Sequence, residues 1–100
     1  MAAYIDPVAA AAEHYKLLQD GQRARMIEMR LPPGARDNEH SHPNEFVYFI
    51  QGSKARIRVD GETMELDIPD GMVMEHEPWT HSVENIGDRE IVAVIFELKE

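Results

Sequence analysis

The chain has 100 residues and a formal net charge of −9, from 19 acidic and 10 basic side chains. A chain of this size closes a single hydrophobic core, so a site belongs either to that one domain or to an interface between copies. The acidic balance disfavours phosphate backbones and anionic lipid, and we therefore expect neither nucleic acid nor membrane as a partner. The absence of cysteine excludes disulfides, thiol nucleophiles and thiolate ligands, which leaves His and carboxylate as metal donors.

The N-terminal residues predict a short helix. Asp6 stands before Pro7, as an N-cap stands before the first helical position, and an alanine-rich run follows. The segment lacks the basic start and the long apolar run of a secretory signal, so we expect a cytoplasmic protein. We assign residues 1–21 to an N-terminal arm with this helix and an edge strand, and residues 22–100 to the main domain.

The rest of the chain predicts short, evenly spaced strands separated by turn residues. This spacing is typical of an antiparallel sandwich or barrel, so the expected fold class is all-β with a short N-terminal helical segment. The predicted strands are Tyr15–Leu18, Ala24–Leu31, Glu45–Gln51, Lys54–Val59, Glu62–Ile68, Met72–His76, Trp79–Glu84 and Glu90–Leu98.

One predicted hairpin has a definite register. Asp60-Gly61 suits a two-residue type I′ turn, which places apolar partners together on one face and opposite charges together on the other. The apolar side of the hairpin then pairs Val59 with Glu62, Ile57 with Met64 and Ala55 with Leu66.

Two predicted strands are apolar on both faces. Residues 45–51 carry Phe46, Tyr48 and Ile50 on the face opposite Val47, and residues 91–98 are likewise apolar on both sides. Such strands need cover on both sides, either from the N-terminal segment or from a second subunit. We favour a homodimer.

The candidate site lies around His40, His42, Glu45 and His81. Side chains two apart on a strand share a face, so the first two histidines can bind one ion together. Glu45 would point away from that face, unless a turn at Pro43 resets the alternation and brings it inward. With the third imidazole, the set suits one divalent transition metal ion per chain, and Fe, Mn, Zn, Ni and Cu are not distinguished.

The residues around this set resemble the two motifs of the cupin superfamily. The resemblance extends over residues 22–98, and its loop between His42 and Glu45 is one residue shorter than the usual minimum. The second motif is split by an insertion, so we anchor it on His81 and Asn85. The first motif corresponds to Gly34, His40, His42, Glu45 and Gly52, and the second to Pro69, Gly71, His81 and Asn85.

The cupin resemblance implies an antiparallel double-stranded β-helix, or jelly roll, that dimerises and binds a small molecule. It leaves the reaction open, because the superfamily includes dioxygenases, isomerases, lyases, storage proteins and sugar-binding regulators. Our leading hypothesis is a metal-dependent enzyme, an oxygenase (an oxidoreductase) or an isomerase, acting on a small organic acid or carbonyl compound. The alternatives are a non-catalytic module that binds a small metabolite and a structural cupin without metal.

Two further side chains enter this hypothesis. Tyr48 is the candidate catalytic group, because the sequence offers no other obvious general base besides the candidate ligand Glu45. His76 either lines the same cavity or lies at the surface.

Overall fold

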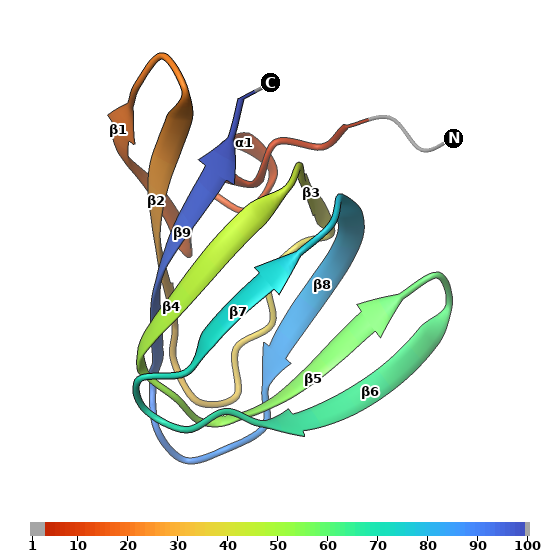
Figure 1. Cartoon of the computed structure of the whole chain (residues 1–100). Helices are drawn as coiled ribbons and strands as arrows, with labels where there is room; N and C mark the ends of the chain where they lie inside the picture. The colour runs from red at the N-terminus through yellow and green to blue at the C-terminus, as the bar shows by residue number, and fades with distance from the viewer. Residues whose placement is uncertain (1–3, 100) are drawn as a thin grey trace.

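The computed structural model describes residues 4–99 as one short helix and nine strands (Figure 1). Residues 1–3 and residue 100, at the outer ends of the predicted arm and main domain, lie outside the described residues. In chain order the elements are α1 (Pro7–Ala10), β1 (Tyr15–Asp20), β2 (Ala24–Leu31), β3 (His40–His42), β4 (Glu45–Gln51), β5 (Lys54–Val59), β6 (Glu62–Asp67), β7 (Val73–His76), β8 (Trp79–Asn85) and β9 (Ile91–Leu98).

The strands form two antiparallel sheets, which confirms the all-β prediction. One sheet has five strands in the order β1-β2-β9-β4-β7, and the other has four in the order β3-β8-β5-β6. Figure 1 shows α1, β3 and the end of β9 together at one end of the barrel. Strands that are distant in sequence therefore meet at this end, and the candidate site lies there.

The predicted N-terminal helix is present as one turn. The Asp6 side chain caps it by accepting a hydrogen bond of 3.0 Å from the backbone N–H of Val8, and Pro7 begins the helix. Within residues 4–99, no helix has the length and apolar character that crossing a membrane requires.

The predicted hairpin register is confirmed pair by pair in β5 and β6. Val59 lies opposite Glu62, and Ile57 lies opposite Met64. Asp60 has a φ of 51° and Gly61 a φ of 76°, the positive values that a type I′ turn requires at both central positions.

Strand β3 is the main element that the predicted strand list lacks. It has only three residues and pairs with β8, which sets His40 opposite His81 and His42 opposite Trp79. A strand of this length carries too little alternation to be recognised by pattern alone.

Two residues of the expected motifs have structural roles. Gly52 ends β4 where a Cβ atom would lie 1.8 Å from the carbonyl oxygen of Ile68, so no larger residue fits without moving the backbone. Asn85 is fully buried, and its amide donates to the carbonyl oxygens of Leu31 at 2.8 Å and Arg89 at 2.6 Å. The Asn85 side chain thus connects the end of β8 to Leu31 and to the turn before β9.

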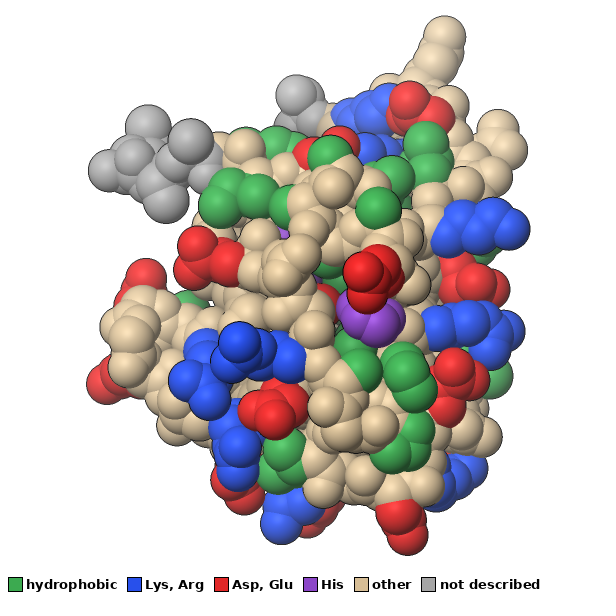
Figure 2. All heavy atoms as spheres, turned by 180° about the vertical axis from the view of Figure 1, so that it is seen from behind, with side chains coloured by type: hydrophobic (Ala, Val, Ile, Leu, Met, Phe, Trp, Pro, Cys, Tyr) green, Lys and Arg blue, Asp and Glu red, His purple; other side chains and the backbone are tan. Residues whose placement is uncertain are grey.

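The outer face of β4 is apolar and exposed. Val47 and Phe49 point into the core, whereas Phe46, Tyr48 and Ile50 are 40%, 45% and 52% exposed. From residue 4 onward, the N-terminal segment does not cover this face, because α1 packs against β1 and β3. On the view from behind, by contrast, Figure 2 shows Lys and Arg side chains interspersed with Asp and Glu.

We predict that the chain forms a homodimer through this outer face of β4. Soluble monomers rarely expose a continuous apolar patch larger than about a few hundred Å². The several apolar side chains on this face would form a patch beyond that limit. Light scattering should give twice the 11.4 kDa chain mass, and Tyr48→Glu should give monomers or insoluble protein. Met64→Glu, which changes an exposed apolar residue of β6, is the control and should leave the mass unchanged. A monomeric unmodified chain at micromolar concentration would refute the dimer.

Candidate metal centre

Three buried imidazoles meet at the end of the barrel where β3 lies beside β8. His40 and His42 come from β3 and His81 from β8, and one ring nitrogen of each lies within 4.8 Å of the others. The ring centroid of His40 lies 4.8 Å from the ring centroid of His42 and 4.8 Å from that of His81. The sequence prediction placed these three residues in one site, and the structure brings them together.

Several nitrogens of this cluster have no hydrogen-bond partner among the described residues. His40 Nδ1 lies 2.7 Å from the carbonyl oxygen of Asn38, while its Nε2 has no partner. His81 is 6% exposed, and neither of its ring nitrogens has a partner. Leaving such a group unpaired costs about 1–3 kcal/mol. A metal ion bound to these nitrogens would supply the missing partner, so the residues fit one.

Burial keeps the imidazoles of His40 and His81 neutral. It lowers the pKa of His40 to about 4, with a further contribution from the nearby His42. It lowers the pKa of His81 to about 2, again with His40 and His42 adding to the effect. Neutral imidazole is the form that binds metal, so both ligands are ready at pH 7 without losing a proton.

Comparison with known proteins shows the family of this chain. The family model for the cupin domain matches residues 27–97. The chain belongs to the cupin family. No curated protein sequence matches it.

Solved structures share the fold of this cupin. A cupin domain from Bordetella pertussis Tohama I has a TM-score of 0.79 and 24% identity, over 86% of this chain and 92% of that one. A protein with a double-stranded β-helix domain from Klebsiella pneumoniae has a TM-score of 0.65 and 18% identity, over 86% and 83%. An RmlC-like cupin from Methanocaldococcus jannaschii has a TM-score of 0.67 and 13% identity, over 84% and 77%. The predicted double-stranded β-helix is thereby confirmed.

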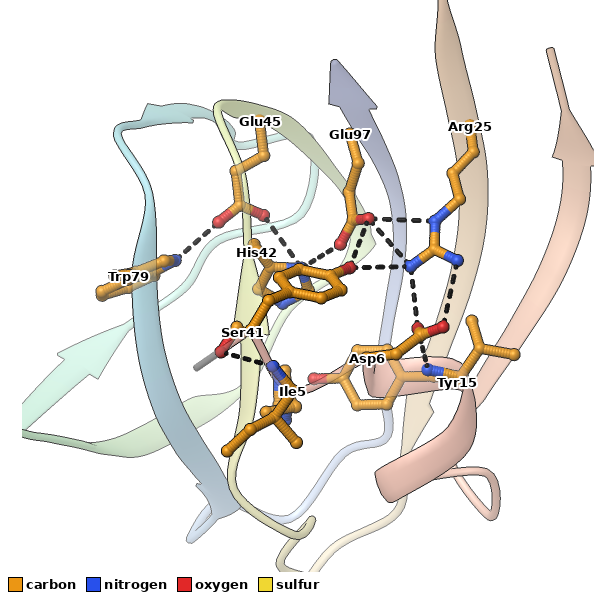
Figure 3. A network of polar contacts seen from close by, with 12 residues as sticks. Ile5, Asp6, Tyr15, Arg25, Ser41, His42, Glu45, Trp79 and Glu97 are labelled. Carbon is orange, nitrogen blue, oxygen red and sulfur yellow. Dashed lines mark hydrogen bonds and ion pairs between the residues drawn. The ribbon is translucent and has the colours of Figure 1, made fainter. Parts of the chain in front are cut away.

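Glu45 is buried beside the cluster. Its Oε2 accepts a hydrogen bond of 2.6 Å from the Trp79 indole, and its Oε1 lies 3.9 Å from His42 Nδ1 (Figure 3). Burial raises the pKa of this carboxyl, although His42 and the indole act in the opposite direction. The side chain thus points inward, as the turn at Pro43 was expected to allow, but it faces the His42 nitrogen that is already hydrogen-bonded to Glu97.

We predict that Glu45→Gln lowers the affinity for the metal by about 10- to 100-fold. This loss is smaller than the one expected when a histidine is removed. The amide keeps the volume and an acceptor for the Trp79 indole but removes the negative charge beside the site. Competition titration with a chelating dye measures the change. An unchanged affinity would exclude Glu45 as a ligand and leave a site of three histidines.

The structure does not bring Tyr48, the predicted catalytic group, to this site. This residue follows Val47, which points inward, so the strand alternation turns Tyr48 outward. The tyrosine at the cluster is Tyr15, whose ring centroid lies 4.7 Å from that of His40 and whose hydroxyl donates to Asp37 Oδ2 at 2.8 Å. Burial raises the pKa of Asp37 to about 6. The sequence held no signal that linked Tyr15 to the histidines.

Glu97 is the second residue that the sequence analysis missed. It is 2% exposed, and its Oε2 lies 2.5 Å from His42 Nδ1. A signal was present, because Glu97 ends the inward row of β9 that otherwise carries only Ile91, Ala93 and Ile95. A carboxylate on an apolar inward row is expected to have a buried partner.

An inner cavity at the cluster and an outer cleft share Glu45 in their linings. The inner cavity holds about 40 Å³, and His42, Glu45 and His81 line it together with mainly apolar side chains. The outer cleft holds about 450 Å³. Its lining consists of Asn44, Glu45, Phe46, Glu75, His76, Glu77 and Leu98.

Trp79 contacts both His76, which lines the outer cleft, and His81, which lines the inner cavity. Its ring stacks on His76 at 3.6 Å between centroids and lies 4.0 Å from the ring of His81. His76 lies in the lining of the outer cleft and outside the three-histidine cluster. Glu45 lines both hollows.

Proposed function

We propose that this cupin binds one divalent transition metal ion through His40, His42 and His81, and that it is a metal-dependent enzyme of the oxygenase or isomerase type. The observation that carries the proposal is the convergence of three buried imidazoles whose nitrogens are in part unpaired. Three imidazole donors also leave positions of the ion free for a substrate.

The surrounding residues support catalysis in distinct ways. A bound metal would polarise a carbonyl group or activate dioxygen. The Trp79 ring packs against the His81 ring and forms part of the wall of the inner cavity. Glu45 lies at the boundary between the two hollows, where its carboxylate can accept a proton from a molecule in the outer cleft.

The charges of the outer cleft restrict the substrate. Glu45, Glu75 and Glu77 line it, and they disfavour a molecule that carries several negative charges. The inner cavity of about 40 Å³ admits only a water-sized group. We therefore propose a small carbonyl compound or monocarboxylic acid whose oxygen points toward the histidines and whose remainder stays in the outer cleft.

A non-catalytic binding module is the second candidate function. The observation in its favour is the same small inner cavity, which leaves little space for a reacting molecule beside a metal ion. In that case the protein would bind a small ligand at the outer cleft without converting it.

Elemental analysis of untagged protein, purified without chelators, tests the proposal. We expect about one equivalent of a transition metal per chain. Metal-loaded protein should then consume oxygen, or exchange the proton next to a carbonyl with solvent deuterium, when small carbonyl compounds are supplied. Ligand binding without turnover would support the binding module. Protein that neither contains nor takes up metal would overturn the proposal.

A further inference from the structure

Glu97 is a buried carboxylate with three kinds of partner. Besides His42 Nδ1, it accepts a hydrogen bond of 3.0 Å from Arg25 Nε, and the Tyr4 hydroxyl lies 3.3 Å from the same Oε1 atom. A second Arg25 nitrogen lies 2.9 Å from Oε1 as an ion pair. A buried charge is retained only when it is paired and hydrogen-bonded in this way.

The hydrogen bond to Glu97 decides which His42 nitrogen carries the proton. An ionised carboxylate only accepts hydrogen bonds, so the contact of 2.5 Å requires a proton on Nδ1. In neutral imidazole the other nitrogen, Nε2, is then an acceptor and can bind metal. Without this partner both forms become available, and the form with the proton on Nε2 cannot bind through that atom.

Arg25 connects Glu97 to the N-terminal residues. Its Nη2 donates to Asp6 Oδ1 at 2.8 Å, and Asp6 is also the cap of α1 (Figure 3). The preceding residue, Ile5, exchanges backbone and side-chain hydrogen bonds with Ser41, which stands between His40 and His42 on β3. The segment Ile5–Asp6 thus contacts the two-histidine strand directly through Ser41 and indirectly through Arg25 and Glu97.

We propose that Glu97 is the positioning residue that holds His42 with its proton on Nδ1, and that the Asp6–Arg25 ion pair keeps Glu97 in place. Metal affinity then depends on the N-terminal segment, although Asp6 and Arg25 lie outside the three-histidine cluster. The part of this inference that concerns affinity rests on the proposed function. The part that concerns the proton on His42 does not.

The first test is the proton position in metal-free protein, read from the ¹⁵N shifts of the imidazole nitrogens. We expect the proton on Nδ1 of His42 in the unmodified chain and in Glu97→Gln, whose amide oxygen still accepts. Glu97→Leu should shift part of the population to Nε2. A proton on Nε2 in the unmodified protein, or the same distribution in Glu97→Leu, would overturn the inference whether or not the protein binds metal.

The second test is affinity for Zn²⁺ and Co²⁺ by competition titration. We expect a loss of about 10- to 100-fold in Glu97→Leu and in Arg25→Met, and a smaller loss in Glu97→Gln. Arg30→Met is the matched control, because Arg30 lies on the same strand and pairs with Glu28 and Glu90 at the surface. It should bind as the unmodified chain does.

Circular dichroism shows which variants fold. If Glu97→Leu does not fold, the separate variants Arg25→Met and Glu97→Gln decide the question. Affinities in Arg25→Met equal to those in Arg30→Met would overturn the role of the ion pair. If the unmodified protein binds neither ion, the proposed function fails, and the proton position still tests the role of Glu97.

Discussion

We expect His42→Ala to remove nearly all bound metal from this cupin. His42 is one of three imidazoles whose nitrogens converge within 4.8 Å, and its loss leaves only two donors for the ion. Removing a residue that merely supports a ligand costs about 10- to 100-fold in affinity, so the loss of a ligand should exceed about 100-fold. Elemental analysis and competition titration of untagged protein measure the effect.

Two other histidines provide the controls. His14 lies away from the cluster, where its ring contacts the backbone of Arg30, and His76 stacks on Trp79 on the outer side. His14→Ala and His76→Ala should each retain about one metal ion per chain. Unchanged metal in His42→Ala, or equal loss in His14→Ala, would contradict the three-histidine site.

The second large effect concerns the stability of the metal-free protein. We expect His81→Leu to raise the free energy of unfolding at pH 7 by about 1–3 kcal/mol, because it removes a buried side chain whose two nitrogens have no partner. Leucine has about the volume of histidine, so the core stays filled. The variant should gain stability and lose metal binding together.

Acid should enlarge this difference. The pKa of His81 is lowered from 6.5 to about 2 and that of His40 to about 4, so the unfolded chain takes up protons below pH 6.5 while the folded one does not. Each residue then costs about 3 kcal/mol of stability between pH 6.5 and pH 4. Asp37 acts in the opposite direction: its pKa is raised to about 6, and protonation between pH 6 and pH 4 restores about 3 kcal/mol.

The metal-free protein should therefore lose stability as the pH falls to 4, and His81→Leu should lose about 3 kcal/mol less. Urea unfolding in the presence of a chelator measures both. His42→Leu is the control of opposite sign, because His42 is hydrogen-bonded to Glu97 and its removal leaves a buried carboxylate with one partner fewer. It should destabilise the protein. A destabilised His81→Leu at pH 7 would show that His81 is satisfied without metal.

Local sequence signals were sufficient for most of the fold. The turn at Asp60-Gly61 determines the register of β5 and β6 because both residues take positive φ values that few residue types tolerate. The Asp6-Pro7 pair determines where α1 begins, since both act within one helical turn. Alternation of apolar residues located the strands because the strand period is two and does not depend on the partner strand.

The sequence also supplied the three histidines, because spacing places two of them on one strand face and the cupin motif supplies the third. Only the tertiary structure decided their surroundings. Glu97 on β9 reaches His42 across 55 positions of the chain, and the pairing of β2 with β9 brings Arg25 to Glu97 across 72 positions. Tyr15 lies beside the histidines and Tyr48 does not, because a side chain reaches the site only if its strand presents that face to the barrel interior. Contacts of this kind depend on which strands lie side by side, and no local pattern contains that information.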